Sequence, residues 1–177
     1  MKRLFLGICL LFGSIHLFRY LQPAPHFDGA PGALAVERIG TAGEVVRESF
    51  QPRSAPYLAV YHSAGWCPPC QQFSPHLAEF YHLADKSRHR FQLVMVNYDR
   101  SEDDMLAYLR QHHMEFPAVR RGGAGAWGRA TGEGIPNLVI IDSASGQVVS
   151  SSFDGTTYQG CDRPLAVLRT IVGAGHP

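Results

Sequence analysis

Two predominantly apolar runs, separated by an amphipathic stretch, dominate the hydrophobic pattern of the chain. Residues 57–62 and 91–97 are rich in aromatic, aliphatic and β-branched side chains, which predicts two strands. The intervening residues 68–84 are predicted to form a helix, because apolar side chains recur at helical spacing at Phe73, Leu77, Phe80, Tyr81 and Ala84. Since a strand, a helix and a strand in succession form a right-handed crossover, we expect the two strands to be parallel.

The flanking segments predict further short elements. Residues 33–50 predict one or two strands, and residues 138–141 and 147–150 predict an antiparallel hairpin around a polar turn. The other elements that we expect are a helix from Ser101 to about His113, an extended segment at 116–119, a glycine-rich loop at 120–134, a loop at 151–160 and a last helix at 162–173.

Composition sets the size of the core and excludes one class of partner. The chain has 177 residues, of which 45% are hydrophobic, which is ample for one globular core and a leader. Its net charge is +1, and no stretch is basic enough to follow a phosphate backbone. We therefore expect no nucleic-acid partner.

The amino terminus has the pattern of an export signal. A short basic start is followed by a mostly apolar run at 4–18, which is short for a membrane span but suits a secretory signal. We therefore assign residues 1–21 to a signal peptide or an N-terminal membrane anchor, residues 22–32 to a linker and residues 33–177 to one domain. Either form of the leader exports the domain, and we expect it in a bacterial periplasm or cell envelope.

The sequence Cys67-Pro68-Pro69-Cys70 stands where the predicted helix begins. Unpaired N–H groups and the aligned peptide dipoles favour negative charge at that position, which lowers the pKa of a thiol. We place Cys67 at the N-cap and Pro68 in the first turn, so that the N–H of Cys70 can reach the Cys67 sulfur. Cys67 is then the exposed nucleophile and Cys70 its buried partner.

Other uses of this cysteine pair are a structural zinc site and an inert disulfide. A structural zinc site needs four ligands, whereas Cys9 and Cys161 are isolated and His112 and His113 follow no second cysteine pair at suitable spacing. We therefore favour redox chemistry, with no metal and no cofactor.

A family resemblance rests on these residues. Trp66 to Cys70 after an apolar strand resembles the thioredoxin superfamily, and the Pro-Pro interior with its flanks at 61–64 and 73–75 resembles the tryparedoxin and nucleoredoxin branch. The resemblance covers roughly residues 57–172. It implies a thioredoxin fold for the domain, an α/β fold with a central mixed β-sheet flanked by helices. It also implies thiol-disulfide oxidoreductase activity, in which Cys67 attacks and Cys70 resolves.

The pair Ile135-Pro136 directly precedes the predicted strand at 138–141. The resemblance implies that this peptide bond is cis and that it faces the cysteine pair, although the same residues also fit an ordinary loop proline. We expect the substrate to contact Trp66, Pro68, Pro69, Ile135 and Pro136.

One position departs from thioredoxin itself. Thioredoxins carry a buried Asp six residues before the first cysteine, whereas Tyr61 stands there in this chain, as it does in the tryparedoxin-like branch. The group that activates Cys70 is therefore open. Asp99 follows the strand at 91–97 and should lie at the same end of the sheet as the cysteines. It is a candidate proton acceptor, and the alternative is a turn residue.

We expect an exported, monomeric protein-disulfide reductase that takes electrons from an upstream thiol donor and acts on disulfide-bearing client proteins. The residue before the proline, by resemblance, and the uncharged Pro-Pro interior favour reduction. The alternatives are a disulfide oxidase or isomerase, and a non-catalytic module that binds metal or peptide. Cys161 is either a regulatory thiol or a buried one, and Trp127 either contacts a partner or anchors its loop.

Overall fold

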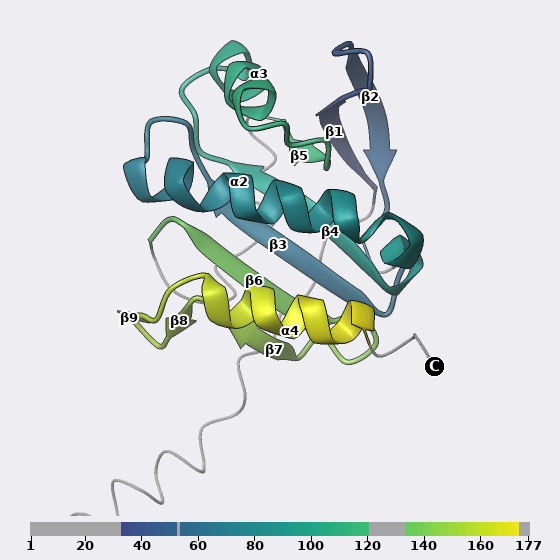
Figure 1. Ribbon diagram of the computed structural model, residues 1–177, viewed down its shortest axis with the longest axis vertical. Helices are drawn as coiled ribbons and strands as arrows, with labels where there is room; N and C mark the ends of the chain where they lie inside the picture. The colour runs from purple at the N-terminus through teal and green to yellow at the C-terminus, as the bar shows by residue number, and fades with distance from the viewer. Residues whose placement is uncertain (1–32, 53, 121–133, 174–177) are drawn as a thin grey trace, which may run out of the picture.

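The computed structural model describes residues 33–52, 54–120 and 134–173 (Figure 1). The predicted signal or anchor at 1–21, the linker at 22–32 and Trp127 lie outside the described residues. Within those three described ranges, no helix is long and apolar enough to cross a lipid bilayer.

Seven strands form one mixed sheet in the order β2-β1-β5-β4-β3-β6-β7. Their bounds are β1 Leu34–Ile39, β2 Val45–Phe50, β3 Tyr57–Ser63, β4 Phe91–Asn97, β5 Ala118–Val119, β6 Asn137–Asp142 and β7 Val148–Ser151. β3 pairs parallel with β4 and antiparallel with β6, and β6 pairs antiparallel with β7. The predicted parallel crossover and the predicted hairpin are both confirmed.

In the described part of the chain, three α-helices and one short 3-10 helix accompany the sheet. They are α2 Pro68–Leu83, η1 Asp85–Arg90, α3 Glu102–Gln111 and α4 Asp162–Gly173. Figure 1 shows α2 and α4 lying across the same face of the sheet. The predicted cap of α3 is present, because the N–H of Asp104 donates to Ser101 Oγ at 3.1 Å.

The alternation of side chains along β3 divides the core in two. Ala59 and Tyr61 belong to a cluster that the helices cover, whereas Leu58 and Val60 belong to a second cluster on the other face. The helices contribute to the first cluster chiefly through Phe73, Leu77, Phe80, Met105, Leu109, Leu165 and Leu168. The central strands are buried on both faces, which explains their near-continuous apolar sequence.

The prediction of a loop over residues 151–160 is wrong. This segment contains a small antiparallel pair, β8 Phe153–Asp154 and β9 Thr157–Tyr158. Gly155 has a φ of 60°, and a glycine at the first position of a two-residue turn is a hairpin signal. Strands of two residues are too short to show an alternating pattern, so the turn was the available signal.

The buried carboxylate of Glu37 lies among charged side chains from β2, from the residue after β5 and from the start of α3. Glu37 on β1 is completely buried, and Arg47 on β2 donates to its Oε1 through Nε at 2.8 Å. The Nε of Arg120, next to β5, lies 3.7 Å from the same oxygen. Arg120 also donates two hydrogen bonds, of 3.0 and 3.2 Å, to Glu102 at the start of α3. These contacts therefore link the β1–β2 hairpin to the residue after β5 and to the start of α3.

We predict that Arg47→Ala lowers the free energy of unfolding by about 1–3 kcal/mol, because it leaves a buried carboxylate oxygen without its shortest partner. Arg38→Ala is the matched control, since Arg38 on the same hairpin pairs with Glu48 at 3.3 Å where both side chains are partly exposed. We expect this control to cost less than about 1 kcal/mol. Urea unfolding measures both values, and equal losses would contradict the role assigned to Glu37.

Candidate redox site

Cys67 and Cys70 form a disulfide at the start of α2, with their Cα atoms 5.2 Å apart. Cys67 has the extended backbone of an N-cap residue, and Pro68 and Pro69 form the first turn of the helix. The main-chain N–H of Cys70 donates to Cys67 Sγ at 3.3 Å. The predicted helix start and the predicted contact between these two residues are both confirmed.

The disulfide is less exposed to solvent than the sequence predicts. Cys70 is fully buried as expected, but Cys67 is only 4% exposed, so the prediction of an exposed Cys67 is wrong for this oxidised form. Its sulfur is bonded to Cys70, and Ile135 packs against the pair. The exposed surface next to the disulfide belongs instead to Trp66, which is 57% exposed, and to the two prolines that follow Cys67.

The segment before β6 faces the disulfide. The Ile135–Pro136 peptide bond is cis, which confirms what the resemblance implies. The carbonyl oxygen of Ile135 lies 3.8 Å from Cys67 Sγ. An oxidised sulfur has no proton to donate, whereas the reduced thiol could donate one to this carbonyl. The arrangement brings a main-chain carbonyl next to the cysteine pair, and the predicted contact of Ile135 and Pro136 with a substrate stays a prediction.

Asp99 lies at the same end of the sheet as the disulfide, as predicted. Its Oδ1 accepts the N–H of Gly65 at 2.8 Å, and its own N–H donates to Asn97 Oδ1 at 3.0 Å. Asp99 is 7% exposed, and within the described part of the chain its Oδ2 is buried without a hydrogen-bond partner. Burial raises the pKa of this carboxyl. The structure thus shows a turn-binding contact, and the role of proton acceptor stays a prediction.

Gly65 is held tightly just before the disulfide motif. Its carbonyl accepts a hydrogen bond from the Gln71 side chain, and its N–H donates to Asp99. A Cβ atom at this position would lie 3.1 Å from the Cβ of Tyr108 and 3.4 Å from Asp99 Oδ1. A residue with a Cβ atom at this position would therefore require Tyr108 to move slightly away from the turn.

Tyr98 and His62 are site residues that received no role from the sequence. The Trp66 indole N–H donates to the main-chain oxygen of Tyr98 at 3.0 Å, and a 3.1 Å hydrogen bond joins the Tyr98 hydroxyl to His62 Nδ1. Burial lowers the pKa of His62 to about 4, so its ring is neutral near physiological pH. Tyr98 could have been found by the same signal as Asp99, because it too directly follows a predicted strand.

Four buried hydroxyl groups lie beneath Cys70. Tyr61 OH donates to the carbonyl oxygen of Cys70 at 3.4 Å and bonds Ser74 Oγ at 2.9 Å. Ser74 Oγ also bonds Tyr108 OH, which bonds Ser63 Oγ at 2.9 Å. Burial raises the pKa of both tyrosines, so the cluster is uncharged. Neutral hydroxyls, with Tyr61 among them, therefore lie where thioredoxin itself carries a buried Asp, six residues before the first cysteine.

Cys161 is buried and lies in the helix-covered core. Ser152 Oγ donates to its sulfur at 3.1 Å, and burial raises the pKa of the thiol. These contacts favour the buried thiol over the regulatory one among the two alternatives for Cys161.

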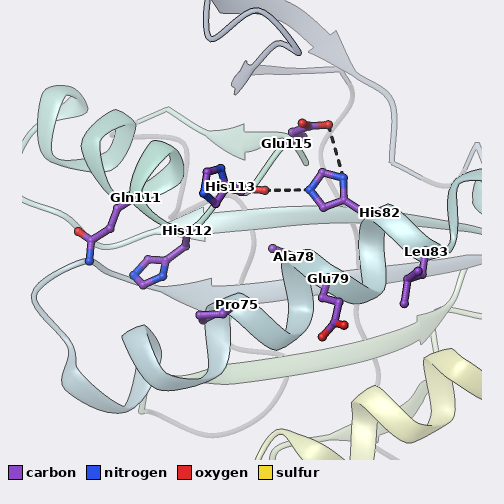
Figure 2. Close-up of a pocket in the computed structure, with 9 residues that line it drawn as sticks. All are labelled: Pro75, Ala78, Glu79, His82, Leu83, Gln111, His112, His113 and Glu115. Atoms are coloured by element: carbon purple, nitrogen blue, oxygen red, sulfur yellow. Dashed lines mark hydrogen bonds and ion pairs between the residues drawn. The ribbon is translucent and has the colours of Figure 1, made fainter.

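Hollows beside the disulfide and along α2 are among those in the described part of the molecule. The one beside the disulfide has a volume of about 410 Å³, and Gly65, Trp66, Asp99 and Tyr108 are among the residues that line it. Figure 2 shows the other, of about 530 Å³, between α2 and the end of α3. There His82 Nε2 bonds the carbonyl of His113 at 3.2 Å. No cysteine lines this second hollow, and among the described residues no three His, Cys, Asp or Glu side chains are grouped to hold a metal ion.

Comparison with known proteins agrees with this geometry. Residues 56–148 match the family model described as Thioredoxin-like. Tryparedoxin of Trypanosoma brucei brucei is 31% identical over 123 residues, which are 68% of this chain and 81% of that protein. Nucleoredoxin of Xenopus laevis is 32% identical over 116 residues, which are 62% of this chain but only 28% of that protein. The crystal structure of thioredoxin from Wuchereria bancrofti superposes with a TM-score of 0.58 at 29% identity, covering 84% of this chain and 99% of that one. The predicted thioredoxin fold is thereby confirmed.

Asp99 should make the stability of the protein depend on pH. Because burial raises its pKa above 3.8, the folded chain keeps this proton at pH values where the unfolded chain has lost it. The contribution of Asp99 to stability therefore falls as the pH rises from 3.8 through the raised pKa. Asp99→Asn removes the charge and keeps an oxygen for the N–H of Gly65. We predict that its stability relative to the wild type increases with pH over that window, as measured by urea unfolding.

Asp142→Asn is the control of opposite sign. Hydrogen bonds from the N–H and hydroxyl of Ser145, at 2.8 and 2.7 Å, lower the pKa of Asp142. The ionised form of Asp142 therefore favours the folded state. Asp142→Asn should lose stability relative to the wild type as the pH rises from the lowered pKa to 3.8. If the stability of both variants relative to the wild type changed in the same direction as the pH rises, the raised pKa of Asp99 would be contradicted.

Proposed function

This chain belongs to the Thioredoxin-like family, and we therefore propose that it is a protein-disulfide reductase that works through Cys67 and Cys70. The observation that carries the proposal is the disulfide at the start of α2, with the N–H of Cys70 directed at Cys67 Sγ. A helix start stabilises a thiolate at Cys67, and a nearby second thiol allows the reaction to finish within the same molecule.

The reaction has two exchange steps. In the reduced protein, the Cys67 thiolate attacks one sulfur of a client disulfide, so that a mixed disulfide forms and the other client sulfur leaves as a thiolate. Cys70 then loses its proton and attacks Cys67 Sγ, which releases the second client thiolate and leaves the Cys67–Cys70 disulfide. Two electrons pass to the client, and an upstream dithiol donor restores the reduced protein.

The surroundings of the disulfide support reduction as the direction. The hydroxyl cluster beneath Cys70 is uncharged, the His62 ring is neutral, and the Pro-Pro interior carries no charge. An anionic Asp99 would disfavour a thiolate nearby. These groups do not stabilise the reduced form unusually, and such stabilisation is what makes a dithiol a strong oxidant.

The reduction potential of the Cys67–Cys70 pair tests this direction. We predict a value below about −200 mV, in the range of reducing members of the superfamily, rather than near about −120 mV as in a strong oxidant. Equilibration with glutathione or dithiothreitol buffers, followed by alkylation of the free thiols, measures it. A potential near the upper value would favour the alternative of a disulfide oxidase.

We further propose that the domain is exported to a bacterial periplasm or cell envelope and acts there as a monomer on disulfide-bearing clients. Support comes from the basic start and the apolar run at 4–18, which follow the order of a secretory signal or an anchor. Disulfides persist in such a compartment, which provides substrates for a reductase.

Variants of the two cysteines test the activity and the compartment together. We predict that Cys67→Ser abolishes reduction of insulin disulfides, because the attacking sulfur is lost. Cys70→Ser should form mixed disulfides that it cannot resolve, and mass spectrometry of the trapped complexes in cells identifies the clients. We expect clients from the cell envelope, and a set of purely cytosolic clients would contradict export.

Cys161→Ala is the matched control, since it removes a buried thiol outside the proposed reaction. It should reduce insulin at the wild-type rate and trap no client. Retention of reductase activity in Cys67→Ser would instead refute the proposed function.

A further inference from the structure

We propose that the hydroxyl cluster of Tyr61, Ser63, Ser74 and Tyr108 positions Cys70 for its attack on the mixed disulfide. Tyr61 is the member that joins the cluster to the backbone of Cys70. The inference rests on the proposed function and assigns a part in its second step. It concerns positioning, because none of the four hydroxyls contacts a cysteine sulfur in the hydrogen bonds described above.

The cluster joins three elements at one buried point. Tyr61 and Ser63 lie on β3, Ser74 on α2 and Tyr108 on α3. The first three residues are fully buried, and Tyr108 is 2% exposed. Water therefore cannot replace a lost bond at these positions, and each hydroxyl depends on its neighbours.

The first half of α2 lacks one backbone hydrogen bond because Pro75 lies inside the helix and carries no N–H. Pro68 and Pro69 cost no such bond, since the N–H groups of the first turn have no partner within the helix. The ring of Pro75 removes the donor that would otherwise bond the carbonyl of Gln71. The two bonds of Tyr61, to the Cys70 carbonyl and to Ser74 Oγ, hold the segment just before Pro75 from the side of the sheet.

The order of the protons in the cluster follows from its last acceptor. The Cys70 carbonyl can only accept, so Tyr61 donates to it. Ser74 then donates to Tyr61, Tyr108 to Ser74, and Ser63 to Tyr108. In this arrangement each hydroxyl donates to the next group in a series that ends at the Cys70 carbonyl. Hydrogen bonds that follow one another in this way strengthen each other.

The cluster should matter for one of the two exchange steps. Attack by Cys67 on a client depends on the N-cap sulfur and on the N–H of Cys70 that donates to it, and none of the four hydroxyls bonds either group. Attack by Cys70 on Cys67 Sγ depends on where the backbone of α2 places the second sulfur. A displacement of about 1 Å at a reacting group can slow a reaction roughly 100-fold.

An aryl disulfide separates the two steps. Reduced protein mixed with dithiobis(nitrobenzoate) releases one coloured thiolate when Cys67 attacks and forms the mixed disulfide. It releases a second when Cys70 attacks Cys67 Sγ and closes the intramolecular disulfide. Cys70→Ser identifies the second phase, because this variant lacks it.

We expect Tyr61→Phe, which removes a single oxygen, to slow the second release roughly 10- to 100-fold and leave the first unchanged. Tyr57→Phe is the matched control, since it deletes the same group on the same strand outside the cluster, and both of its phases should match the wild type. If both phases in Tyr61→Phe had the wild-type rates, or if both were slowed equally, the proposal would be overturned.

If Tyr61→Phe does not fold by circular dichroism, the same measurement on Tyr108→Phe decides, because Tyr108 lies further along the cluster from Cys70. An unchanged second phase in that variant overturns the proposal. Failure of the proposed function is distinguishable, since the wild type would then release no more thiolate than Cys70→Ser does.

Discussion

The contact on which the site depends is the hydrogen bond from the N–H of Cys70 to Cys67 Sγ. It requires Cys67 to be the N-cap residue of α2, which in turn requires the helix to begin at Pro68. The two prolines favour that start because their φ is preset and they need no acceptor. The same four residues thus define the helix end, the spacing of the sulfurs and the electrostatic environment of the first one.

The described polar groups on the buried side of this contact are neutral, with one exception. Hydroxyls lie beneath Cys70, and His62 is neutral because burial disfavours its charged form. Asp99 is the exception, since it combines burial with a carboxylate oxygen that lacks a partner among the described residues. It retains this cost while binding Gly65 N–H in the turn before the disulfide. Burial of the Asp99 carboxylate therefore costs some stability, while its hydrogen bond to Gly65 holds the turn before the disulfide in place.

The sequence alone predicted the parts of the fold that have a strong period or a strong local motif. β3, β4 and α2 were found because their apolar residues repeat over six or more positions, and the helix start was found because Cys67 and the prolines act locally. The β8–β9 pair was missed because each strand has two residues. The hydroxyl cluster was missed because it joins residues far apart in the chain, such as Tyr61 and Tyr108. No periodic pattern records which buried hydroxyls meet.

The order of the strands leaves β2 and β7 at the two borders of the sheet. An open border offers unpaired backbone groups to another chain, and proteins commonly blunt it with charge, brevity or a bulge. β2 carries the exposed side chains of Arg47 and Glu48, while β7 has four residues and an irregular register against β6. Both borders are thus poor templates for a further strand, which disfavours edge-to-edge pairing between copies of the chain.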